Sequence, residues 1–116
     1  MAVSEEYRLF VLEQLGRVAP ITSRRMFGGL GLYSGGLFFA LVDDDVLFFK
    51  VDEESRAVFQ AAGSRPFEPW EGNVMPGYWE VPPGVLEDDE RLSEYVKSAL
   101  RAASAAKKKP RNRRAR

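Results

Sequence analysis

The sequence has 116 residues, no net charge and a hydrophobic content of 45%, which is sufficient for the core of one small domain. Cysteine and histidine are both absent. This excludes disulfides, Ser-His-Asp triads, Cys-His pairs, and metal sites built from thiolates or imidazoles. Chemistry by carboxylates, lysine or arginine remains open, but no motif has the spacing of such a site. We therefore expect a protein that is not an enzyme and holds no cofactor.

Basic residues are concentrated at the C-terminal end of the chain. Residues 107–116 contain seven basic residues and no acid, which leaves ten basic and 17 acidic residues in 1–106. We therefore divide the chain into a domain at 1–106 and a disordered basic tail at 107–116.

The sequence carries no sign of a membrane segment. No apolar run approaches the roughly 20 residues that a membrane-spanning helix needs. The first residues also lack the basic and apolar stretches of a signal peptide. We expect a cytoplasmic protein.

The first half of the chain predicts one helix followed by three strands. Ser4 is a suitable N-cap, and apolar residues follow at helical spacing over about 5–15 until Gly16. Short connections rich in glycine or aspartate then predict antiparallel hairpins. The predicted strands are Arg24–Tyr33, which glycines interrupt, Leu37–Val42 and Val46–Val51.

The second half predicts a helix, two short strands and a long final helix. Asp52 can cap a helix over about 53–62 that Gly63 ends. Two strand candidates, Pro66–Trp70 and Tyr78–Val81, lie in an irregular stretch rich in proline and glycine. The final helix is predicted by apolar residues at offsets 0, 3, 4, 7, 8 and 11, which are Leu92, Tyr95, Val96, Ala99, Leu100 and Ala103.

The element order α-β-β-β-α-β-β-α predicts a two-layer α+β fold, with an antiparallel sheet that carries helices on one side. The strands at 37–42 and 46–51 are apolar at both alternating positions, so both faces of the sheet need cover. We expect a homodimer, with Phe38 or Phe48 near the interface. The alternative is that the final helix or the Pro-rich loop covers the second face.

Three groups of residues form a specific pattern across the predicted strands and the final helix. They are Arg25-Met26-Phe27-Gly28-Gly29-Leu30-Gly31-Leu32-Tyr33, then Phe39–Val42 with Leu47–Asp52, and then Tyr78–Pro82 with Val85–Asp88. This pattern resembles the TfoX N-terminal domain family of competence regulators over about residues 4–103. The resemblance implies a two-layer fold similar in outline to secretion chaperones and YjbR-like proteins, and it implies no catalytic residue. Full-length regulators of that family carry a second helical domain where this chain has its basic tail, so the resemblance concerns the fold more than a role in competence.

Arg24 and Arg25 precede a glycine-rich stretch that includes Gly28 and Gly29. Guanidinium groups and glycine backbone N–H groups together can bind an anion such as phosphate. The spacing fits neither a P-loop nor a dinucleotide fingerprint, because no helix follows. The alternative is a bulged strand whose glycines make room for a packed helix or aromatic ring.

Two further features have a chemical and a structural interpretation. Asp43-Asp44-Asp45 offers carboxylates to a hard cation, but the sequence lacks a calcium-loop pattern, and a solvated turn is the alternative. Lys50 is the only polar residue within its strand. Burial would lower its pKa and make it nucleophilic, whereas a lysine at the surface would be inert.

Two hypotheses of function remain. The leading one is a non-enzymatic regulatory or adaptor domain that binds a protein or peptide partner as a homodimer. Phe38, Phe48 and Trp79 are the candidate contacts for a second copy or a partner, although Trp79 and its aromatic neighbours also suit the edge of a core. The alternative is a nucleic-acid-associated protein whose tail neutralises phosphates without sequence preference. The tail contacts would be Lys107, Lys108, Lys109, Arg111, Arg113, Arg114 and Arg116.

Overall fold

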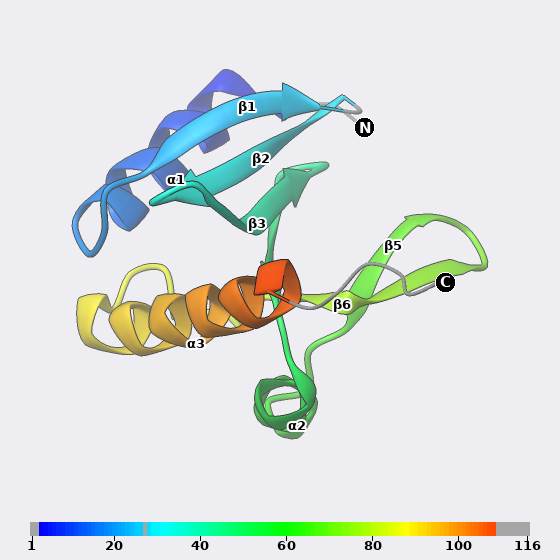
Figure 1. Cartoon of the computed structure of the whole chain (residues 1–116). Helices are drawn as coiled ribbons and strands as arrows, with labels where there is room; N and C mark the ends of the chain where they lie inside the picture. Colours follow the sequence, from blue (N-terminus) through cyan, green and yellow to red (C-terminus); the bar gives the residue numbers. More distant parts are fainter. Residues whose placement is uncertain (1–2, 27, 109–116) are drawn as a thin grey trace.

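The computed structural model describes residues 3–26 and 28–108, and it confirms the expected α+β class (Figure 1). These residues form three helices and six strands. Their bounds are α1 (Glu5–Gly16), β1 (Thr22–Met26), β2 (Gly29–Ser34), β3 (Leu37–Asp43), β4 (Val46–Lys50), α2 (Glu53–Ala61), β5 (Pro66–Trp70), β6 (Asn73–Glu80) and α3 (Asp89–Lys108).

The six strands form one antiparallel sheet in the order β1-β2-β3-β4-β6-β5. The first four strands are consecutive neighbours joined by tight turns. After α2 the chain returns so that β6 pairs with β4, with Phe48 opposite Glu80. β5 therefore lies at the edge of the sheet, where its two prolines interrupt no central ladder.

The glycine-interrupted segment at 24–33 forms two strands in the structure, so four strands precede α2 where the sequence suggested three. Gly28 adopts a φ of 78°, a left-handed conformation that glycine reaches without strain, and the chain turns there from β1 into β2. Gly29 packs against the backbone carbonyl of Val42 on β3. Gly31 lies beneath the side chains of Met26 and Phe38. These glycines thus make room for a neighbouring strand and for side chains. Of the partners that the packing interpretation names, the aromatic ring of Phe38 lies over Gly31, whereas the segment forms a hairpin and not a single bulged strand.

Both expected N-caps are present. The Ser4 hydroxyl accepts a hydrogen bond from the backbone N–H of Tyr7 at 3.1 Å. Asp52 and Ser55 form a reciprocal capping box, in which the Asp52 carboxylate accepts from the Ser55 N–H at 2.8 Å. This N–H and the nearby Arg101 guanidinium hold the pKa of Asp52 below its usual value.

All three helices contribute to one buried cluster on a single face of the sheet. Leu15 of α1 and Phe59 of α2 belong to this cluster, as do Leu92 and the residues at helical spacing after it on α3. The sheet contributes Phe39 and Phe49, whose rings lie 5.6 Å apart and are fully buried. Within residues 3–26 and 28–108, no helix covers the other face of the sheet.

α3 continues through Lys108, so the expected domain boundary after residue 106 falls within its last turn. Lys107 is exposed there. The rest of the basic tail from Lys109 onward, for which we predict disorder, lies outside the described residues.

The change Gly29→Ala should destabilise the protein by about 1–3 kcal/mol, because the new methyl group would collide with the Val42 carbonyl and force β2 and β3 apart. Gly16→Ala is the matched control. The space around Gly16 is open. Alanine at that helical position should leave the free energy of unfolding unchanged or raise it by about 0.5–1 kcal/mol. Urea unfolding of both variants measures the difference, and equal stabilities would contradict this account of Gly29.

Candidate functional site

The face of the sheet that the helices leave uncovered, here called the open face, carries apolar and aromatic side chains. Cross-strand pairing aligns Gly31 of β2 with Leu41 of β3, and Leu41 with Phe48 of β4. Phe38 and Tyr78 lie on the same face, with ring centroids 5.8 Å apart. Leu41, Phe48, Phe38 and Tyr78 are half-buried in the single chain. The open face is therefore apolar at its centre, as expected from strands that are apolar at both alternating positions.

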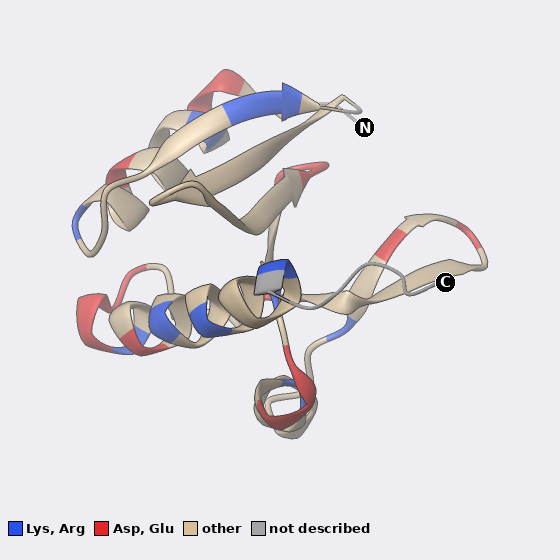
Figure 2. Cartoon of the chain, in the orientation of Figure 1, with Lys and Arg blue, Asp and Glu red and all other residues tan. Residues whose placement is uncertain are grey.

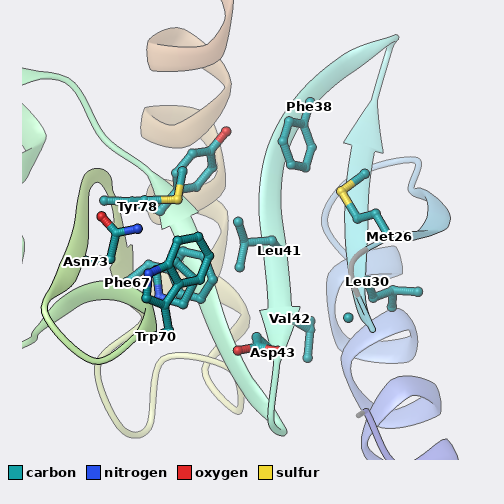
Figure 3. Close-up of a pocket in the computed structure, with 13 residues that line it drawn as sticks. Met26, Leu30, Phe38, Leu41, Val42, Asp43, Phe67, Trp70, Asn73 and Tyr78 are labelled. Carbon is teal, nitrogen blue, oxygen red and sulfur yellow. The ribbon is translucent and has the colours of Figure 1, made fainter. Parts of the chain in front are cut away.

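A groove with a cavity volume of about 470 Å³ lies on the open face. Figure 3 shows its two sides. The β5–β6 hairpin forms one side and contributes Phe67 and Trp70. The sheet forms the other side and contributes Met26, Phe38 and Leu41. The volume falls within the range of known binding pockets, and most of its lining is apolar.

The β5–β6 hairpin beside the groove carries exposed apolar side chains. Trp70, Val74 and Met75 are 65%, 47% and 42% exposed. Among the described residues only two other large hydrophobic side chains, Leu9 and Val58, are comparably exposed, and both lie on helices. Exposed apolar side chains gathered on one hairpin are typical of a surface that contacts another protein.

A row of aromatic rings crosses the open face and has a cation at each end. The Arg24 guanidinium lies 5.7 Å from the Tyr33 ring centre, and the Tyr33 ring lies 5.2 Å from that of Phe38. After Tyr78 the row ends at Lys50, whose Nζ atom is 5.0 Å from the Tyr78 ring centre. Such contacts between cations and rings are favourable and keep both cations on the open face.

Lys50 is half-buried, and this burial lowers the pKa of its ammonium group. Within the described part of the chain, no carboxylate lies within 4.0 Å of Lys50 Nζ. Lys50 is thus neither fully buried nor freely exposed. Its environment lies between the buried and the surface positions that the two sequence interpretations assume. Its position beside Tyr78 makes it a charged group at the end of an apolar surface.

Charged residues lie on both sides of the groove (Figure 2). On the sheet side, β1 to β3 carry Arg24 on the open face and Asp43 at the end of β3. The hairpin side carries Glu68 and Glu71. Asp43 is the charged residue among those that line the groove.

The three predicted contact residues do not share one face. Phe38 and Phe48 lie on the open face, where Phe48 packs against Phe67 with ring centroids 4.8 Å apart. Trp79 is 8% exposed and lies in the cluster beneath the helices, opposite Phe49. Its indole N–H donates to the carbonyl of Pro76 at 3.0 Å. Trp79 therefore belongs to the core, as its alternative interpretation holds.

The predicted anion contacts are also separated. Arg24 lies on the open face, whereas Arg25 alternates to the other side and contributes to a lowered pKa of Glu5 on α1, for which Arg8 is the main cause. Gly28 is in a turn and Gly29 is buried against β3. The four residues do not converge on a common point.

Asp44 and Asp45 form the turn between β3 and β4, and Asp43 is the last residue of β3. Asp44 and Asp45 have φ values of 55° and 59°, as a tight hairpin turn requires. The Asp45 carboxylate accepts a hydrogen bond from the Ser4 N–H at 2.8 Å and so connects this turn to the start of α1. Within residues 3–26 and 28–108, no three acidic side chains gather closely enough to hold a metal ion.

Sequence reasoning did not identify the groove residues Met26, Leu41, Phe67 and Met75. The available signal was weak. Trp70, Val74 and Met75 are apolar residues among prolines and glycines in a stretch without basic residues, a pattern that fits an exposed hairpin as well as a buried loop. Only the pairing of β6 with β4 places this hairpin beside the open face.

No helix in the described part of the chain is both long and apolar enough to cross a membrane.

Comparisons with known proteins place the chain in a family. No curated protein matches the chain. The model of the TfoX N-terminal domain matches residues 13–103, which run from the second half of α1 to the last turns of α3. Since this match spans most of the sequence, the chain belongs to the TfoX N-terminal domain family.

Proposed function

We propose that the chain is a non-enzymatic regulatory or adaptor domain that acts by binding a protein or peptide partner, and that it forms a homodimer. The observation that supports this most directly is the open face of the sheet. An apolar groove of about 470 Å³ lies on this face beside exposed Trp70 and Met75. Membership of the TfoX N-terminal domain family agrees with a regulatory role.

The same face also supports the proposed homodimer. Leu41, Phe48 and Phe38 are only half-buried, although they lie at the centre of a sheet. Apolar surface in water is unfavourable by roughly 25 cal/mol per Å², so its cover by another molecule is stabilising. A second copy of the chain is present wherever the first copy is made. Two-fold homodimers are also the commonest soluble oligomers.

At micromolar concentration the full chain should sediment with twice the mass of one chain. Met75→Glu, which adds a charge beside the groove, should shift the protein toward the monomer. Val58→Glu is the matched control, because Val58 is similarly exposed but lies on α2, away from the open face. A wild-type monomer throughout this range would contradict the proposed homodimer.

The adaptor role predicts that cellular partners depend on the open face. Tagged wild-type protein and the Val58→Glu variant should capture the same proteins from the native cell, and Met75→Glu should lose them. The captured proteins either contact this face or require the dimer that it forms. Quantitative mass spectrometry compares the three samples, and equal capture by Met75→Glu would exclude the open face from partner binding.

Nucleic-acid binding is a second candidate function, supported by the basic C-terminal end. Lys107 is exposed at the end of α3, and the sequence after it continues with further basic residues. Contacts of this kind release counterions from phosphates, so the affinity falls as salt rises.

A chain that ends at Ala106 should lose DNA and RNA binding in a gel-shift assay. For the full chain, the logarithm of the binding constant should fall with the logarithm of salt, with a slope as steep as about −6 if all seven tail cations pair with phosphates. If both chains bind equally at every salt concentration, the tail has no part in such binding.

A further inference from the structure

The two outer edges of the sheet differ in how well they can accept a further strand. β5 forms one edge, where Pro66 and Pro69 have no backbone N–H to donate. β1 forms the other edge and contains no proline (Figure 1). Among the described residues, β1 has a strand neighbour only on the side of β2, and no loop there hydrogen-bonds to its backbone. The edge at β1 is therefore the one that is open to backbone pairing.

The β1 edge is exposed and carries two cations. The first four residues of β1 are exposed to solvent. Arg24 lies on the open face over the Tyr33 ring, and Arg25 points to the opposite face because side chains alternate along a strand. No carboxylate in the described part of the chain lies within 4.0 Å of either guanidinium group. Residues 18–42 contain these two arginines and no acid, so the neighbouring sequence does not offset their charge.

These charges disfavour a second copy of the chain as the added strand. When two β1 strands pair antiparallel about a two-fold axis with all five residues matched, Arg24 of one copy lies opposite Arg24 of the other. A register shifted by one residue places Arg24 opposite Arg25. Like charges that lie directly opposite destabilise a sheet, whereas opposite charges stabilise it. The β1 edge is thus protected against pairing with itself and is complementary to an acidic strand.

We infer that the β1 edge binds an extended, acidic segment of a partner protein, which adds to the sheet as a further strand. Backbone hydrogen bonds to β1 supply the affinity, and the side chains of the segment supply the specificity. Successive residues of the added strand point to opposite faces of the sheet, as Arg24 and Arg25 do. Two adjacent acidic residues in the segment therefore meet the two guanidinium groups, one on each face.

This inference rests on the proposed binding of a protein or peptide partner, and it names the chemistry of that partner. It requires neither the homodimer nor the groove. The groove lies on a face of the sheet beside the β5–β6 hairpin, and Met26 is the one residue of β1 that lines it. β1 is the strand farthest from β5 in the order of the sheet. The edge and the groove can therefore be tested separately.

A short peptide tests the pairing with the full chain. The probe is fluorescein-labelled Thr-Val-Thr-Glu-Glu-Thr-Val-Thr, in which strand-forming residues flank two adjacent glutamates. Fluorescence anisotropy should detect its binding. The same peptide with lysines in place of the glutamates should bind about tenfold more weakly or worse, because its charges repel the two arginines. In an NMR titration, the glutamate peptide should move the backbone amide signals of β1 and β2 more than those of β5 and β6.

Charge reversal on the protein gives the reciprocal test. The double variant Arg24→Glu with Arg25→Glu should bind the glutamate peptide about tenfold more weakly and should prefer the lysine peptide. Arg91→Glu with Lys97→Glu is the matched control, because it makes the same change in net charge at exposed positions on α3. The control should keep both affinities within about twofold of the wild type, since salt screens exposed charges that are far apart. Circular dichroism confirms that each variant retains the fold.

Backbone pairing has a test of its own. The glutamate peptide with every internal backbone nitrogen methylated keeps its charges but has no internal N–H to donate. It should bind about tenfold more weakly than the unmethylated peptide, because the ladder with β1 loses its donors. Equal binding of the two peptides would show an attraction of charges alone and would overturn the added strand.

The remaining outcomes separate the inference from the proposed function. No binding of the glutamate peptide at millimolar concentration overturns the inference, and so does equal binding by the wild type and the Arg24→Glu, Arg25→Glu variant. If Met75→Glu loses the peptide while the double arginine variant keeps it, the peptide occupies the open face. That result overturns the edge site and retains the proposed partner binding. If the peptide instead dissociates a wild-type dimer, a second copy occupies the edge, and the inference is also overturned.

Discussion

The structure depends on one imbalance: the central strands are apolar on both faces, but all three helices cover the same face. Side chains alternate along β3 and β4, so Ala40 and Phe49 enter the core while Leu41 and Phe48 emerge on the opposite side. Burial of the first set closes the domain. The second set is only half-buried, and the groove and the exposed hairpin lie around it.

Much of the fold is predictable from the sequence because its signals are local. Ser4 and Asp52 cap helices through groups within three residues, and tight turns define the early hairpins. The division of 24–33 into β1 and β2 was missed, because a glycine-rich stretch is equally consistent with an interrupted strand and with a turn. The placement of β6 between β4 and β5 could not be predicted either, because the pairing of β6 with β4 joins residues far apart in the chain.

The candidate site was predictable only in part, for a related reason. Phe38 and Phe48 could be assigned to a second apolar face because their strands are apolar at every position. The sequence does not indicate in this way whether Trp79 or its neighbour Tyr78 lies on the open face. Adjacent strand residues point to opposite faces, and which one enters the core depends on the register with β4, where Trp79 lies opposite Phe49. The groove requires the same register, so none of its hairpin side could be assigned from sequence.

The late pairing of β6 with β4 has a consequence for how the chain folds as it is synthesised. β1 to β4 are joined by short turns and can assemble as soon as they emerge from the ribosome, because their contacts close only small loops. The outer edge of β4 must then wait for Tyr78–Glu80, some 30 residues later in the chain. During that interval an apolar strand, Val-Leu-Phe-Phe-Lys, has unpaired backbone groups along one edge. The nascent domain is therefore most prone to aggregation before its last two strands are made.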